Sequence, residues 1–83
     1  MWLAKVYVTL KPVVNDPQGI TIQGALHNLG FASVKGVRAG KYFEVRLEAP
    51  DKAEAERAVA DMCARLLANP VIEDFRFEVA QVA

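Results

Sequence analysis

Apolar side chains alternate with other residues from residue 2 to residue 10 of the chain. One side of this stretch carries Trp2, Ala4, Val6, Val8 and Leu10. A period of two predicts a half-buried β-strand, because successive side chains of a strand point to opposite faces. Lys11-Pro12 ends the strand, since proline has no N–H to donate to a neighbouring strand.

A helical pattern follows near residues 17–29. Asp16 is placed to cap the free N–H groups of the first turn, and Pro17 loses nothing at the first helical position by lacking its own N–H. The apolar stripe of this helix consists of Ile22, Leu26 and Leu29. Gly30 follows as a C-terminal cap.

A second helix is predicted near residues 52–68. Asp51 followed by Glu54 resembles a capping box at its start. Its apolar stripe consists of Ala55, Val59, Met62 and Leu66. Asn69-Pro70 ends the helix, because the residue before a proline is disfavoured in the α region.

Three further strands are expected. The first is short, from about Ser33 to Arg38, and a tight connection at Ala39-Gly40, where glycine allows a positive φ, leads into the next. The inward-facing side chains of that next strand are Phe43, Val45 and Leu47. Those of the last strand are Phe75, Phe77 and Val79.

The order β-α-β-β-α-β predicts a single domain spanning residues 1–83, an α+β two-layer sandwich of the ferredoxin-like kind. We expect an antiparallel sheet with both helices on one face. The other face would carry four apolar or aromatic residues among mixed charges, which makes them candidates for self-association. These candidates are Leu3, Tyr7, Tyr42 and Ile72.

Charge and composition exclude several classes of protein. Ten basic and ten acidic residues leave no net charge, whereas nucleic-acid binding draws much of its affinity from an excess of Lys and Arg. No apolar stretch reaches the length of about 18 residues that indicates a membrane span, and the first residues lack the pattern of a secretory signal. The lone Cys63 cannot form an internal disulfide. We therefore expect a cytoplasmic protein that binds neither nucleic acid nor membrane.

The chain has little of the equipment of an enzyme. His27 is its only histidine, and no nucleophile motif or metal-ligand set accompanies it, so a surface or interface role is expected. Cys63 lies beside the apolar stripe of the second helix, where a free cysteine packs as a small hydrophobe. Neither the phosphate-loop pattern nor the dinucleotide-binding pattern occurs. We expect no catalytic, metal-binding or cofactor-binding residue in this chain.

Three junctions between elements are richer in specific polar residues than turns require, which favours a role in contacting other proteins. Arg38 and Lys41 flank a tight turn and could hold a partner's carboxylates. Unlike Asp16 and Asn69, which cap and end helices, Gln18, Arg38 and Lys41 have no local structural duty that the sequence shows. The candidates for partner contact are Asp16, Gln18, Gly19, Arg38, Gly40, Lys41 and Asn69.

These segments together resemble the PurS family, the small subunit of phosphoribosylformylglycinamidine synthase from purine biosynthesis. The resemblance covers nearly the whole chain. It rests on the stretches Lys5–Lys11, Asp16–Gly19 with Ala25–His27, Val37–Lys41, Met62-Cys63 with Leu66–Asn69, and Val71–Phe75.

The resemblance implies a non-catalytic subunit of a glutamine-dependent ligase. In such a complex a glutaminase subunit releases ammonia, and a large ATP-dependent synthetase subunit uses it to form the amidine. The small subunit, as a homodimer or homotetramer, bridges the two and supports ammonia transfer. The complex is expected to use ATP, Mg²⁺ and glutamine, with none of them bound by this chain itself. Whether assembly requires bound ADP or glutamine stays open.

Two other functions are compatible with the expected fold. An RNA-binding module of the RRM type would stack bases on Tyr7 and Tyr42, but the strand at 40–47 fits the RNP1 pattern poorly and carries Glu44. A small-ligand regulatory module could bind an amino acid or nucleotide between two copies, since fold alone does not determine function. A gain in thermal stability with a metabolite, without partner proteins, would favour the second.

Overall fold

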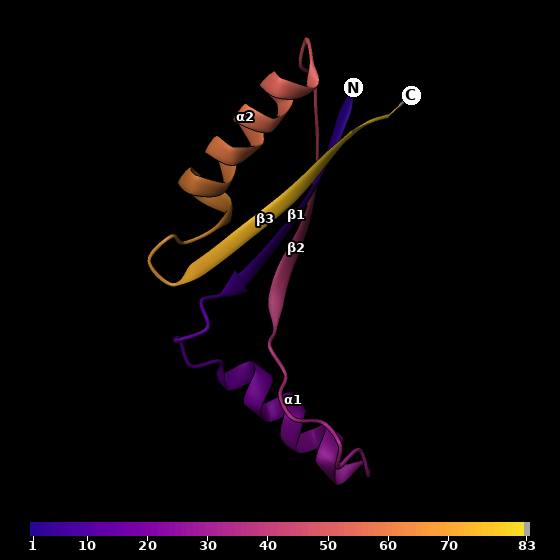
Figure 1. Cartoon of the computed structure of the whole chain (residues 1–83), viewed down its shortest axis with the longest axis vertical. Helices are drawn as coiled ribbons and strands as arrows, with labels where there is room; N and C mark the ends of the chain where they lie inside the picture. The colour runs from indigo at the N-terminus through magenta and orange to yellow at the C-terminus, as the bar shows by residue number, and fades with distance from the viewer. Residues whose placement is uncertain (83) are drawn as a thin grey trace.

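A computed structural model describes residues 1–82 of the chain. These residues form three strands and two helices, the second helix continuing into a wider, π-helical segment (Figure 1). In chain order the elements are β1 (Trp2–Leu10), α1 (Pro17–Asn28), β2 (Gly40–Leu47), α2 (Lys52–Met62), η1 (Cys63–Leu67) and β3 (Glu73–Gln81).

The three strands form one antiparallel sheet in the order β2-β1-β3. β1 is central because it carries the most regular alternation: Ala4, Val6 and Val8 are fully or almost fully buried on one face. Its partners are in register along its length, with Val6 opposite Phe43 on one side and Phe77 on the other. Inward-facing side chains of all three strands therefore line one apolar surface.

Helix α2 covers this apolar surface, packing chiefly against β3 and β1. Asp51 caps it by accepting a hydrogen bond from the N–H of Glu54 at 2.8 Å, as the sequence predicts. Ala55 and Val59 on the inner side of α2, and Cys63 at the start of η1, are completely buried. The predictions of a helix from residue 52 and of Cys63 as a core residue are confirmed.

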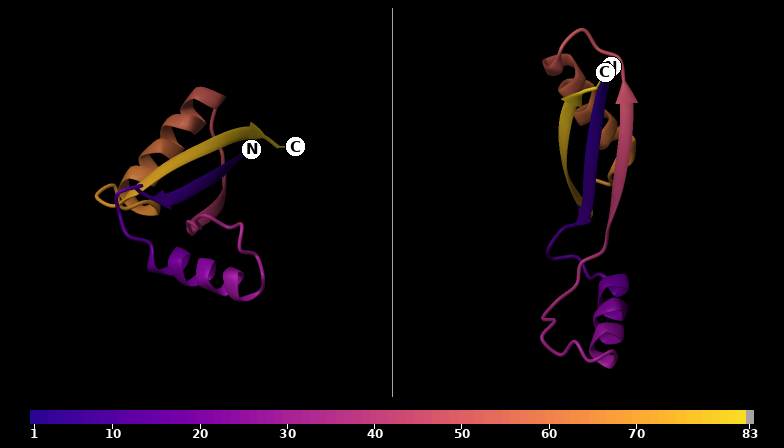
Figure 2. Two further views of the ribbon diagram at one scale, coloured as in Figure 1. Left: turned by 60° about the horizontal axis from the view of Figure 1, so that its bottom comes forward. Right: turned by 90° about the vertical axis from the view of Figure 1, so that its right-hand side faces the viewer.

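The expected α+β, ferredoxin-like class with an antiparallel sheet is confirmed, but α1 lies elsewhere than expected. The helix spans the predicted residues and its cap at Asp16 forms, yet it does not lie on the sheet beside α2. Figure 2 shows α1 projecting beyond the end of the sheet, joined to it by two chain segments. We call residues 12–39 the arm.

The short strand expected over residues 33–38 is absent from the described residues. This segment runs back along α1 to the sheet without pairing in a ladder, and β2 begins only at Gly40. The outer edge of β2 is free, but a strand there would require the chain to reverse at Ala39-Gly40; instead the N–H of Ala39 bonds to Asp16 and Arg38 bonds to the carbonyl of Lys11, which holds the segment at the base of the arm. Gly40 also has no positive φ and makes no hairpin turn; among the described residues only Gly30 has one, at 101°.

Candidate functional site

The arm and the sheet meet at a junction where most of the polar candidates come together. The outgoing chain leaves β1 after residue 10, and the returning chain enters β2 at Gly40, so the two segments lie side by side there (Figure 1). Side chains from both segments tie them to each other. We call this region the junction.

Asp16 is the central group of the junction. Its side chain is only 4% exposed, and its two carboxylate oxygens accept separate hydrogen bonds. Oδ1 accepts from the N–H of Gly19 at 3.0 Å, and Oδ2 accepts from the N–H of Ala39 at 2.8 Å. These two bonds hold the pKa of Asp16 below its usual value, with Arg38 assisting and burial opposing. One carboxylate therefore caps α1 and also holds the returning chain.

Gly19 allows the returning chain to approach the first turn of α1. A Cβ built at this position would lie 2.2 Å from the carbonyl oxygen of Val37 and 2.9 Å from Oδ2 of Asp16. Any larger residue would push the helix and the returning segment apart. The glycine is thus required by close approach of two backbones.

Arg38, on the returning segment, bonds to the backbone of the outgoing segment. Its Nη2 donates to the carbonyl oxygens of Lys11 at 2.9 Å and Val14 at 3.1 Å, with a longer contact to that of Leu10 at 3.5 Å. The last carbonyls of β1 and of the loop after it are satisfied by a residue some two dozen positions away. From the sequence we assigned Arg38 no local duty, and that interpretation is wrong: it cross-links the base of the arm.

Lys41 also has a local partner that the sequence did not reveal. Its Nζ lies 3.3 Å from a carboxylate oxygen of Glu73, at the start of β3. Gly40 precedes it in tight contact with β1, since a Cβ there would lie 2.5 Å from the carbonyl oxygen of Val8. The expected anion-holding pair of Arg38 and Lys41 is therefore already engaged within the chain.

Glu73 connects the last polar candidate, Asn69, to the junction. The backbone N–H of Asn69 donates to Glu73 Oε1 at 2.7 Å, and this bond, with Lys41, lowers the pKa of Glu73. The side chain of Asn69 accepts from the N–H of Val71 at 3.1 Å, which fixes the turn into β3. The sequence analysis missed Glu73; its one signal was an acid at a strand start beside a polar turn.

The exposed surface of the junction is a shallow recess of ≈ 220 Å³. We call it the junction recess; its lining is Leu10, Asp16, Gln18, Ala39, Gly40, Lys41 and Glu73. Gln18 lies exposed on the first turn of α1 at its rim. Six of the seven candidates for partner contact thus meet at or beside this recess, and Asn69 is linked to it through Glu73.

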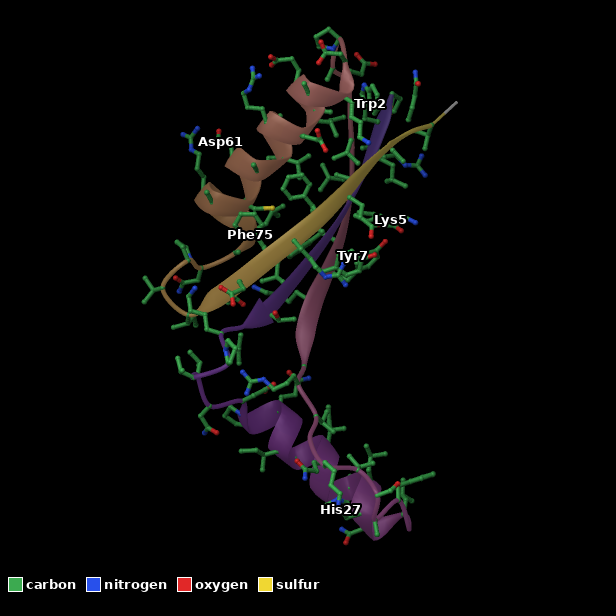
Figure 3. The ribbon with its side chains drawn as sticks, viewed as in Figure 1. Trp2, Lys5, Tyr7, His27, Asp61 and Phe75 are labelled. Carbon is green, nitrogen blue, oxygen red and sulfur yellow. The ribbon has the colours of Figure 1, made fainter. Side chains whose placement is uncertain are left out.

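The sheet face opposite α2 carries an aromatic cluster. The rings of Tyr7 and Tyr42 have centroids 5.2 Å apart, and the guanidinium of Arg76 lies 4.0 Å above the ring of Tyr7 (Figure 3 labels Tyr7). Partial burial and a hydrogen bond to Glu44 raise the pKa of Tyr42 to about 12. Tyr42 remains 49% exposed, whereas Leu3 and Tyr7 are half-buried. Ile72 is exposed just before β3, outside this cluster.

The remaining chemistry-bearing side chains do not converge on the junction. His27 is exposed near the far end of the arm, where its Nε2 lies 2.8 Å from the carbonyl oxygen of Val34 (Figure 3). Burial raises the pKa of the Cys63 thiol at the start of η1. Among residues 1–82, no three His, Cys, Asp or Glu side chains lie close enough to hold a metal ion. None of the helices in that range is long and apolar enough to span a membrane.

The described residues form a small α+β domain of the ferredoxin-like class, with a polar junction between its sheet and its arm. The family model of PurS, phosphoribosylformylglycinamidine (FGAM) synthase, matches residues 3–81. The chain belongs to the PurS family.

Relatives support this assignment over the full length of the chain. The phosphoribosylformylglycinamidine synthase subunit PurS of Bacillus subtilis is 49% identical over 82 residues, covering 99% of this chain and 96% of that protein. The crystal structure of Methanocaldococcus jannaschii PurS is similar with a TM-score of 0.90 at 40% identity, covering both chains completely. A chain in the structure of PurLQS from Thermotoga maritima matches with a TM-score of 0.86 at 31% identity, covering 96% of this chain and 99% of that one.

Proposed function

We propose that this chain is the non-catalytic small subunit of a phosphoribosylformylglycinamidine synthase. It would bridge a glutaminase subunit and an ATP-dependent synthetase subunit in the cytoplasm, and support ammonia transfer between them. The observation that carries this proposal is the match to the PurS family from residue 3 to residue 81. The similarity to a chain of the Thermotoga maritima PurLQS structure supports a place in a multi-subunit assembly.

The geometry of the junction supports a contact role for the junction recess. The carboxylate of Asp16 accepts two backbone hydrogen bonds and Nη2 of Arg38 donates to backbone carbonyls, and these bonds hold the recess in shape. Gln18 and the exposed side of Lys41 remain at its rim to meet a partner. A rigid frame with a few free polar groups suits a subunit that fixes the relative positions of two larger ones.

Bridging has a chemical benefit for this reaction class. Ammonia is largely protonated near neutral pH, and only the neutral form attacks as a nucleophile. A closed assembly that excludes water between two active sites would keep ammonia neutral and prevent its loss. This chain would contribute by geometry alone, while ATP, Mg²⁺ and glutamine would be bound by the larger subunits. Self-association as a homodimer or homotetramer is part of this proposal.

Reconstitution with the two larger subunits tests the proposal. Glutamine-dependent FGAM synthesis should require this chain, whereas synthesis from added ammonium salt should persist without it, because the synthetase chemistry is intact. Gln18→Ala should reduce the glutamine-dependent rate several-fold, and the matched control Gln81→Ala, at the far end of β3, should not. Equal loss of the glutamine-dependent and ammonium-dependent rates would instead indicate a direct effect on the synthetase and would contradict bridging.

A further inference from the structure

The sheet face opposite α2 is hollowed near the end of β1. The hollow has a volume of ≈ 250 Å³ and lies over the cross-strand row in which Thr9 stands between Gly40 and Asp74. Tyr7 and Arg76, which form the next row on the same face, line its side. We call it the sheet hollow, and most of its lining is separate from that of the junction recess.

Gly40 keeps the sheet hollow open. Side chains of a cross-strand pair are neighbours on one face of a sheet, so a side chain at position 40 would stand beside Thr9. A Cβ there would lie 2.5 Å from the carbonyl oxygen of Val8 and 3.1 Å from Cγ2 of Thr9. The row therefore offers the hydroxyl of Thr9 beside a space that no side chain of β2 fills.

Arg76 presents an ordered cation to the sheet hollow. Its guanidinium carbon lies 4.0 Å from the centroid of the Tyr7 ring, and that half-buried ring is itself packed against Tyr42 (Figure 3 labels Tyr7). Among residues 1–82 the guanidinium forms no ion pair, and Arg76 is exposed. A guanidinium held over a ring keeps the N–H groups at its edge available for two parallel hydrogen bonds to a carboxylate.

Asp74 supplies the opposite charge on the other side of the sheet hollow. Lys11 Nζ contacts its Oδ1 at 2.7 Å, and the side chain of Asp74 remains 55% exposed. Its second oxygen can therefore accept a hydrogen bond from another cation. Residues two apart on a strand are about 6.6 Å apart, so an acceptor for a cation and a donor for an anion flank one small space.

We propose that the sheet hollow binds a free α-amino acid as its zwitterion, with the carboxylate on Arg76 and the ammonium group on Asp74. A ligand with only one charge would meet a like charge on one side of the hollow, so the pair favours a molecule that carries both. The volume of ≈ 250 Å³ admits only a short side chain, which would lie over Thr9 in the space left by Gly40. This inference goes beyond the proposed function, which assigns no ligand to this chain.

Titration of the ¹⁵N-labelled chain alone with L-alanine at low salt tests the site. The backbone amide resonances of Thr9, Gly40 and Arg76 should shift saturably, with a dissociation constant on the order of 1 mM, because the hollow is shallow and partly open to water. Propionate and ethylammonium, each lacking one of the two charges, should bind at least about tenfold more weakly. Affinity for propionate equal to that for L-alanine would show a site for anions only and would overturn the proposal. The absence of saturable shifts up to about 50 times the expected dissociation constant would do the same.

Substitutions on the same face locate the ligand. Arg76→Gln should raise the dissociation constant for L-alanine about tenfold or more, and Asp74→Asn about fivefold or more, since each removes one charge-assisted bond. Arg46→Gln is the matched control, because Arg46 is exposed on this face but pairs with Leu3 near the other end of β1. The replaced side chains are all exposed, and circular dichroism would verify that the variants fold. Unchanged affinity in Arg76→Gln, equal weakening by Arg46→Gln, or shifts that follow chain concentration instead of L-alanine, as when a second copy covers the hollow, would each refute the site.

Discussion

Gly19→Ala and Gly24→Ala make the same chemical change in one helix and should alter stability in opposite directions. At Gly24 no heavy atom lies within 4 Å of the new Cβ. The substitution should therefore stabilise the protein by about 0.5–1 kcal/mol, because alanine favours the helix and restricts the unfolded chain. Gly24 also lies on the side of α1 opposite the apolar stripe, so the change leaves that stripe intact.

At Gly19 the new Cβ would lie 2.2 Å from the carbonyl oxygen of Val37, and backbone atoms must move to admit it. Overpacking of this kind costs about 1–3 kcal/mol, which exceeds the helical gain and leaves a net loss of about 1–2 kcal/mol. Urea denaturation monitored by circular dichroism, at one fixed chain concentration, measures both variants. A Gly19→Ala protein as stable as the unsubstituted chain would refute the close approach of helix and returning segment.

Three further predictions follow from the junction and the core. Arg38→Ala should cost about 1 kcal/mol because it removes a charged donor that links the two segments at the base of the arm. Lys41→Ala removes an exposed ion pair and should change stability by less than about 0.5 kcal/mol; comparable urea midpoints for the two would contradict this. The buried Cys63 thiol, whose pKa is raised, should react with a disulfide reagent at neutral pH at least about 100-fold more slowly in the folded protein than in urea, and rapid native labelling would show that it is accessible. The folded pKa values of Asp16 and Glu73 lie below their ordinary 3.8 and 4.5, so their stabilisation is complete above those values and is lost as the pH falls through the folded pKa values. The free energy of unfolding, measured between pH 3 and pH 7, should therefore depend less steeply on pH in Asp16→Asn. An unchanged pH dependence would show that the lowered pKa of Asp16 does not stabilise the fold.

Local pattern predicted most elements of this fold correctly. β1 follows from alternation over residues 2–10, and its buried side chains are those on the predicted side. Both helices begin where Asp16 and Asp51 cap them, and α1 ends at Asn28 with Gly30, at a positive φ, just beyond it. These features depend on neighbours within a few residues, so the chain encodes them without reference to the rest of the structure.

The structure brings most of the candidate residues together at the junction, but the sequence did not show most of their contacts within the chain. Asp16 was recognised as a cap, and the structure adds its second bond, to the N–H of Ala39. Arg38 and Lys41 were assigned no local duty because their partners, the carbonyl of Lys11 and the carboxylate of Glu73, are distant in sequence. Whether these residues also contact partner subunits stays a prediction.

Tertiary structure alone decided where α1 lies and what residues 33–38 do. The stripe on α1 indicates that the helix must be covered, but an apolar stripe does not specify which sheet, or whose, covers it. The local sequence likewise permits a strand over 33–38, but it does not show that Ala39 and Arg38 bond to Asp16 and Lys11, which hold the segment at the base of the arm and away from the free edge of β2. Local sequence determines which segments are helical or extended, whereas packing between distant segments determines where they lie, because hydrogen bonds and burial there depend on residues far apart in the chain.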